Sequence, residues 1–277
     1  MSTCRINQSR QVLKMKTFTT ILVLLLATVV SSKTTEGPLN HCNARIVGGY
    51  HADISEIPFQ VSLIRGRGPL CGGSLISNRW VLTAAHCIES PSQLQVRINS
   101  TFGLAHGTVV NVNRPVVHPN YNELTTDYDF ALLELEEEIE LTDEFYAAEL
   151  PEQDEPIEDG ACLQTSGWGS TENGSGSEDL LVTYVPVISW NQCRKNYRKT
   201  NAITERMICA GYYGGGADAC QGDSGGPLVD GRKLVGVVSF GTGCGKAGLP
   251  GVYAKVSAVR DWIAFVSEGY DSEESEE

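Results

Sequence analysis

The sequence has few basic residues for the number of acidic ones. It holds 21 lysines and arginines against 34 aspartates and glutamates, a formal net charge of -13 at pH 7. Six of the basic residues but only one of the acidic ones lie in residues 1–45, so a chain that begins at residue 46 has a net charge of -18. Such a surface repels the phosphates of nucleic acids and of anionic membranes, which excludes both as partners.

Long hydrophobic runs are also missing. Phe18 to Val30 is mainly apolar but spans only 13 residues, which is short for a membrane helix. Two lysines precede this run and two serines follow it, a pattern typical of a secretory signal peptide over residues 1–32. A retained anchor is the alternative interpretation. The initiator is either Met1 or Met15, because the polar segment before Met15 is longer than a signal peptide needs.

Glycines surround one serine in the stretch Asp-Ala-Cys-Gln-Gly-Asp-Ser-Gly-Gly-Pro-Leu, which runs from Asp218 to Leu228. The glycines let the backbone turn sharply and approach a ligand, so the hydroxyl of Ser224 can be presented there. A serine becomes a good nucleophile only with a base to take its proton, an acid to orient that base, and N–H groups for the oxyanion. The stretch therefore predicts catalysis only if the chain supplies those groups.

Two distant segments supply them. His86 ends the apolar run Val-Leu-Thr-Ala-Ala-His-Cys, and Asp129 stands before the apolar run Phe-Ala-Leu-Leu. Together with Ile-Val-Gly-Gly at residues 46–49, these motifs resemble the trypsin-like serine proteases of the chymotrypsin fold. The resemblance extends from Arg45 to about Val266 and keeps that fold's order of His, Asp and Ser.

The resemblance implies a catalytic role for each of these residues. Asp129 accepts a hydrogen bond from one ring nitrogen of His86, and the other ring nitrogen takes the proton of Ser224 as it attacks a peptide carbonyl to form an acyl-enzyme. The N–H groups of Gly222 and Ser224 form the oxyanion hole. Ser239 matches a serine that supports the buried aspartate in relatives.

It also implies a preference for Arg or Lys. Asp218, six residues before the nucleophile, matches the carboxylate at the floor of the primary pocket. Gly241 and Gly251 match glycines that keep the pocket open for a long side chain. Phe240 stands where trypsin itself has tryptophan, which keeps an apolar face. Arg45 fits the same pocket, so autoactivation is possible.

Residues 33–45 resemble an activation peptide. Cleavage of the Arg45–Ile46 bond frees an α-amino group, whose reference pKa is about 8. In the family this ammonium pairs with the aspartate before the serine, which is Asp223 here. The pairing orders the oxyanion loop and the pocket, so proteolysis acts as a switch.

Nine cysteines in a secreted chain predict disulfides. Cys4 leaves with the signal peptide. The resemblance implies three pairs: Cys71 with Cys87, Cys193 with Cys209, and Cys220 with Cys244. The usual partner of a cysteine at position 162 is replaced by Asp230, so we expect Cys162 to be a buried free thiol. The alternative is a bond between Cys162 and Cys42, which would keep the activation peptide tethered after cleavage.

Short apolar runs with turn signals between them predict an all-β protein, with two six-stranded Greek-key barrels and the active site in the cleft between them. The first set of runs is 60–64, 73–76, 80–84, 94–98, 108–112 and 130–135; the second is 161–168, 180–188, 207–210, 227–229, 234–240 and 251–256. Val259, Trp262, Ile263 and Val266 have helical spacing and predict a C-terminal helix. The protease domain is therefore expected over residues 46–266, and the acidic residues 267–277 are expected to be disordered.

The loop from Val96 to Val112 lacks the paired acids of the vertebrate calcium loop, so we expect no metal and no cofactor. Asn99 and Asn173 lie in glycosylation sequons. The leading hypothesis is a secreted, monomeric, digestive endopeptidase that cuts proteins after Arg or Lys and meets protein inhibitors. Two alternatives are a non-catalytic homologue that serves as a binding module and a cascade or toxin protease with narrow targets.

Overall fold

The computed structural model describes residues 42, 49–66, 68–88, 93–171 and 174–269. The predicted signal peptide, the cleavage site at Arg45 and Ile46, the sequon asparagine Asn173 and the tail from residue 270 lie outside the described residues. Within the described part of the chain, no helix is long and apolar enough to cross a membrane.

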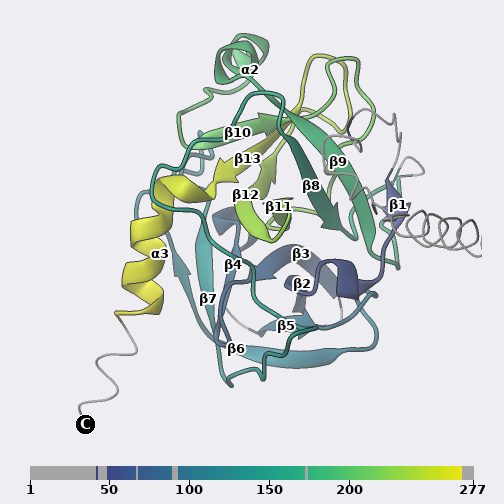
Figure 1. The fold of residues 1–277 in the computed structure, drawn as a ribbon, viewed down its shortest axis with the longest axis vertical. Helices are drawn as coiled ribbons and strands as arrows, with labels where there is room; N and C mark the ends of the chain where they lie inside the picture. Colours follow the sequence, from purple (N-terminus) through teal and green to yellow (C-terminus); the bar gives the residue numbers. More distant parts are fainter. Residues whose placement is uncertain (1–41, 43–48, 67, 89–92, 172–173, 270–277) are drawn as a thin grey trace, which may run out of the picture. The chain divides into compact units, whose positions relative to one another are not determined.

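Six antiparallel strands from the first half of the chain close into a barrel (Figure 1). They follow one another around the barrel as β2 (Gln60–Arg65), β3 (Gly68–Leu75), β4 (Trp80–Thr83), β7 (Ala131–Leu135), β6 (Thr108–Val117) and β5 (Leu94–Ile98). Along β5 the side chains alternate between buried and half-buried, as expected when one face of a strand fills a barrel.

The second half of the chain forms another closed barrel. Its strands pair in the order β9 (Leu181–Ile188), β10 (Met207–Ala210), β13 (Gly251–Lys255), β12 (Lys233–Phe240), β11 (Pro227–Asp230) and β8 (Cys162–Gly167), and β8 pairs again with β9. A short additional strand, β1 (Tyr50–His51), lies against β9. The prediction of two six-stranded barrels is confirmed.

Helices are few and short. Among the described residues, the 3-10 helices η1 (Ile54–Glu56) and η2 (Ala85–Cys87) lie between strands, and η3 (Val256–Val259) leads from β13 into α3 (Arg260–Ser267), the predicted C-terminal helix. The sequence analysis missed α2 (Trp190–Tyr197), because only Cys193 and Tyr197 of its eight residues are buried. It also ended β6 at residue 112, five residues before the strand ends at Val117. A register shift between Val112 and Arg114 lets the strand continue.

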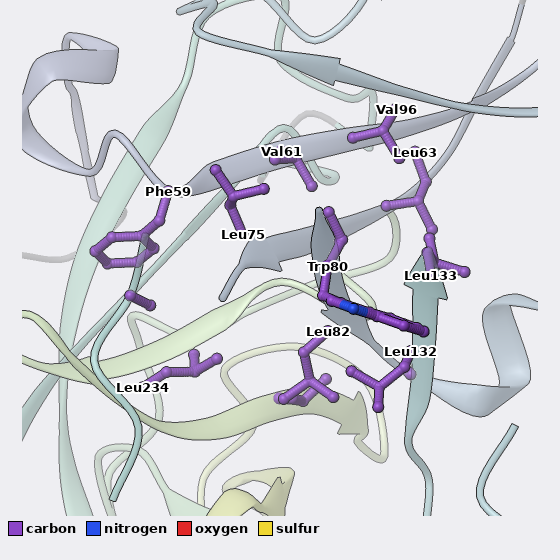
Figure 2. Packing of buried hydrophobic residues seen from close by; sticks show 14 of the residues in the cluster. Phe59, Val61, Leu63, Leu75, Trp80, Leu82, Val96, Leu132, Leu133 and Leu234 are labelled. Atoms are coloured by element: carbon purple, nitrogen blue, oxygen red, sulfur yellow. The ribbon is translucent and has the colours of Figure 1, made fainter. Parts of the chain in front are cut away.

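A common hydrophobic core fixes the two barrels to each other. Figure 2 shows Trp80 among the leucines and valines of the first barrel, with Leu234 of β12 in the same cluster. Ile263 of α3 belongs to it too and is 1% exposed. The loops that leave the two barrels are therefore held in fixed relative positions, which the site requires.

Candidate active site

His86 and Asp129 leave the first barrel at neighbouring points. Thr83 of β4 pairs with Ala131 of β7, so η2 begins and the segment before β7 ends at the same edge of the barrel. The ring Nδ1 of His86 lies 2.7 Å from Oδ2 of Asp129, and the backbone N–H of His86 donates to Oδ1 at 3.0 Å. The carboxylate is fully buried. These contacts fix the ring orientation and leave Nε2 to face a reacting group.

The second barrel adds a third donor to this carboxylate. Ser239, in β12, donates from Oγ to Oδ2 of Asp129 at 2.6 Å and is itself buried. A buried carboxylate that accepts three hydrogen bonds is held in one orientation, because each donor removes rotational freedom from it. The two barrels thus build the His–Asp pair together.

Ser224 comes from the loop that precedes β11. Its carbonyl oxygen accepts a hydrogen bond from the N–H of Gly72 at 2.7 Å, which ties the loop to the middle of β3. The next residue, Gly225, has a φ of +78°, and a Cβ there would collide with Thr83 and come within 2.5 Å of the carbonyl oxygen of Gly72. The serine loop therefore packs against the strand ends from which η2 and His86 emerge.

Gly222 has a backbone conformation that a side chain would oppose. Its φ is +100°, and a Cβ at this position would lie 3.0 Å from Cα of Gly169. Among the described residues, no acceptor pairs with the N–H of Gly222 or of Ser224. Two neighbouring unpaired N–H groups beside a serine can bind a negatively charged oxygen.

Asp218 lies in a recess behind the serine loop. Its Oδ2 accepts a hydrogen bond from the N–H of Gly245 at 2.9 Å, while its buried Oδ1 has no partner among the described residues. Burial raises the pKa of Asp218 to about 6, although the N–H groups of Gly245 and Ala219 act in the opposite direction. A Cβ on Gly251 would lie 2.6 Å from Oδ1, and one on Gly241 would lie 3.1 Å from the carbonyl oxygen of Gly243. The two glycines leave room beside the carboxylate.

A cavity of about 570 Å³ is lined by Gly49, by Asp218 and by a second half-buried carboxylate, Asp223. Asp223 accepts hydrogen bonds from the N–H of Gly169 at 2.7 Å and of Cys220 at 2.9 Å. Burial nonetheless raises its pKa to about 6. A desolvated carboxylate that lines a cavity favours a cation there, because an opposite charge offsets the cost of burying it.

The sequence analysis missed two glycines that this carboxylate requires. A Cβ on Gly167 or on Gly169 would collide with Asp223, and at Gly169 the nearest carboxylate atoms would be 2.5 Å away. The signal is present in the sequence as Gly-Trp-Gly at residues 167–169, where the predicted strand ends. The sequence analysis treats that stretch only as the end of the strand.

Four disulfides join the eight cysteines other than Cys4. Three are the pairs that the resemblance implies: Cys71–Cys87, Cys193–Cys209 and Cys220–Cys244. The fourth joins Cys42 to Cys162, with 5.7 Å between their Cα atoms.

The expectation of a free thiol at Cys162 is therefore wrong. Cys162 begins β8, and its Cα atom lies within the distance range of a disulfide from that of Cys42. The carbonyl oxygen of Cys42 also accepts a hydrogen bond from Tyr212 Oη at 3.4 Å. Asp230, which replaces the usual partner, is exposed at the end of β11.

Side-chain donor atoms of Cys71, His86 and Cys87 lie within 4.8 Å of one another. They do not form a metal site, because both cysteines are consumed in a disulfide and offer no thiolate. Within the described ranges this is the single group of three such donors.

Comparisons with known proteins agree with this geometry. The family model described as Trypsin matches residues 46–263. "Trypsin 5G1" of Aedes aegypti is 52% identical over 228 residues, which cover 81% of this chain and 86% of that protein. "Trypsin" of Simulium vittatum is 47% identical over 223 residues, covering 78% and 90%. "Vitellin-degrading protease" of Bombyx mori is 43% identical over 222 residues, covering 79% and 84%.

Proposed function

The chain belongs to the trypsin family of serine endopeptidases, and on this premise we propose that it is a secreted digestive enzyme that cuts proteins after Arg or Lys. Cleavage between Arg45 and Ile46 activates it. The observation that carries the proposal is the carboxylate of half-buried Asp218, whose buried Oδ1 atom has no partner among the described residues. A desolvated carboxylate with an unused oxygen binds a guanidinium or ammonium group and rejects a neutral side chain.

The contacts of His86 support its role as general base. Asp129 holds Nδ1, so the proton of Ser224 passes to Nε2 as Oγ attacks the peptide carbonyl. The imidazolium then protonates the leaving amine, and an acyl-enzyme remains on Ser224. Water, deprotonated by the same imidazole, releases the acid and restores the serine.

The unpaired N–H groups of Gly222 and Ser224 support their assignment as the oxyanion hole. The charge on the carbonyl oxygen develops only as Oγ attacks, so donors that are fixed beforehand stabilise the transition state more than the substrate. The steric demand at Gly222 explains why a glycine is needed there.

The cavity lined by Gly49 and Asp223 supports activation by a new N-terminus. Ile46 precedes the cavity-lining Gly49 by three residues, and three extended residues span about 10 Å. An ammonium on Ile46 would supply the counter-charge that Asp223 lacks among its described contacts. Its pairing would fix Cys220 and Gly169, which flank the pocket and the oxyanion loop.

Four disulfides fit an oxidising, extracellular location. We include secretion, a monomeric state and recognition by protein protease inhibitors in the proposal. The digestive role rests on the names of the relatives. The vitellin-degrading relative shows that a protein with 43% identity can be named for one substrate, so a narrow target remains the second candidate.

The specificity is tested by measuring the rates at which matched Arg, Lys, Phe and Ala esters are hydrolysed. The rates are measured before and after limited treatment with trypsin, and the new N-terminus is sequenced. We expect activity on the Arg and Lys esters alone, with Ile46 as the N-terminus. Asp218→Ser should abolish the preference for basic side chains while the acyl-enzyme still forms. Persistent Arg selectivity in that variant would move the determinant elsewhere, and Phe selectivity in the parent enzyme would overturn the role of Asp218.

A further inference from the structure

The segment that leads to Asp129 has an unfavourable backbone. Thr126 has a φ of +55° and Tyr128 a φ of +53°, so residues in the left-handed region stand on both sides of Asp127. Side chains oppose this conformation, and a β-branched threonine opposes it most. Such a segment keeps its shape only when contacts from outside hold it.

Those contacts come from the second barrel, from the segment before β10. Arg206 makes a two-pronged ion pair with Asp127, from Nε to Oδ1 at 3.0 Å and from Nη2 to Oδ2 at 2.6 Å. Thr204 Oγ1 donates to the same Oδ1 at 2.9 Å, and Asn201 donates to the carbonyl oxygen of Thr125 at 3.2 Å. The pair is mostly shielded, since the Asp127 side chain is 15% exposed and that of Arg206 is 32% exposed.

Asp127 is held ionised in this setting. Burial alone would raise the pKa of Asp127, but the hydrogen bonds from Arg206 and Thr204 outweigh it and lower that pKa below its usual value. The same carboxylate accepts the N–H of Tyr128 at 3.1 Å, and the carbonyl oxygen of Asp127 accepts the N–H of Asn122 at 3.0 Å. The charge is thus used to shape the local backbone.

Arg206 also contacts the next residue. Its guanidinium carbon lies 4.6 Å from the ring centre of Tyr128, and the ring of His118 stacks on Tyr128 at 4.6 Å. Trp262 of α3 packs against His118 at 4.7 Å. Tyr128 is therefore enclosed between the second barrel and the C-terminal helix, directly before Asp129.

We propose that Arg206 is a positioning residue for catalysis. It holds Asp127 and Tyr128, and through them sets the position of the Asp129 carboxylate against His86. This inference rests on the proposed function, because it assigns to Asp129 the task of orienting His86. The planar guanidinium of an arginine suits this task because it donates two hydrogen bonds to one carboxylate. A lysine would supply the charge without the second hydrogen bond.

The first test compares Arg206→Gln with Arg194→Gln, with rates normalised to titrated active sites. Arg194 is a matched control, because its guanidinium carbon lies 4.9 Å from the ring centre of Trp190 on α2 and, among the described residues, it makes no hydrogen bond or ion pair with residues 125–129. For an Arg amide substrate we expect Arg206→Gln to lower kcat about tenfold or more with KM changed less than about threefold. Arg194→Gln should change neither.

A proton NMR measurement provides a readout that loss of stability alone would not move. The His86 Nδ1–H proton, which lies in the bond to Asp129, should shift or broaden in Arg206→Gln and stay unchanged in Arg194→Gln. Arg206→Lys should restore part of kcat and part of the signal. If Arg206→Gln keeps both the parent kcat per active site and the parent resonance, the inference is wrong.

The double variant Asp127→Asn/Arg206→Gln separates positioning from the cost of an unpaired charge. Under the proposal kcat stays low in the double variant. The unpaired carboxylate of Asp127 has been removed, but the guanidinium of Arg206 that positions the segment is still missing. Full recovery of kcat would show that the single variant suffered only from a buried unpaired charge, and would overturn the inference. If an active-site titrant detects no active sites in the parent enzyme, that result would instead count against the proposed function.

Discussion

At the scale of single residues, the site depends on carboxylates that have different neighbours. Asp129 accepts three hydrogen bonds from His86 and Ser239, whereas one oxygen of Asp218 has no partner among the described residues. The first arrangement fixes an orientation, and the second leaves a desolvated oxygen for a cation to bind. Under the proposed function, the same type of side chain performs two tasks because its hydrogen-bond partners differ.

Gly222→Ala should lower kcat by about 100-fold to 1000-fold, the range found when one oxyanion donor is lost. The added Cβ would meet Gly169, and alanine resists the φ of +100°, so the N–H would turn away from the substrate. Steady-state kinetics on an Arg amide measure this. Gly231→Ala, at a turn with φ of +61° and open space around it, serves as the control for the backbone effect alone. Equal losses in the two variants would contradict the assignment.

The raised pKa of Asp218 predicts how substrate binding varies with pH. With a pKa of about 6 the group is ionised above that pH and becomes protonated below it. KM for an Arg ester should therefore rise as the pH falls from 7 to 5. KM in the Asp218→Ser variant should be high at every pH and lack this titration. If KM in the parent enzyme does not change between pH 7 and pH 5, the carboxylate of Asp218 is not the group that binds the basic side chain of the substrate.

The short motifs led to residues that the structure brings together, such as His86, Asp129 and Ser239, because catalytic chemistry restricts the residue type at each position of a motif. The supporting residues could not be predicted in this way. Gly169 and Arg206 act through contacts with Asp223 and Asp127, which lie 54 and 79 positions away in the sequence. Nothing local in the chain marks such pairs.

At the scale of elements, hydrophobic runs located the strands because each strand has to fill a barrel. All twelve predicted runs overlap strands of the two barrels. Errors occurred where the tertiary setting decides: β6 continues past Pro115 after a register shift, and α2 buries too little to give a periodic pattern. The C-terminal helix was predictable, because its buried positions repeat at helical spacing.

Two substitutions within α3 test whether this helix is held by its buried face. Ile263→Ala should lower the free energy of unfolding by about 2–4 kcal/mol, since Ile263 is 1% exposed in the shared core. Phe265→Ala should change it by less than about 0.5 kcal/mol, because Phe265 is 79% exposed. The free energies of unfolding of both variants are measured with a denaturant. Both variants also carry Ser224→Ala, which prevents self-digestion. Similar effects would contradict the observed packing.

At the scale of the whole molecule, the chain divides its tasks between the barrels. The first supplies His86 and Asp129, and the second supplies Ser224, Ser239 and the pocket. A shared core keeps these parts in register. The fourth disulfide adds a covalent link that the usual pattern of the family did not indicate, because its partner cysteine lies outside the protease domain.

The Cys42–Cys162 bond predicts that the segment before the cut stays attached. After cleavage at Arg45–Ile46, mass spectrometry under non-reducing conditions should find the segment that contains Cys42 bound to the enzyme, and reduction should release it. Cys42→Ser should lose the segment without reduction. Its release from the unreduced parent protein would show that this disulfide does not form.

The most direct test of the account is a burst titration with an Arg ester before and after the cut at Arg45–Ile46. The account predicts a burst close to one equivalent only after the cut, with the acyl group on Ser224 by peptide mapping, and none in Ser224→Ala. A complete cut at Ile46 without a burst, or an acyl group on another residue, would contradict it.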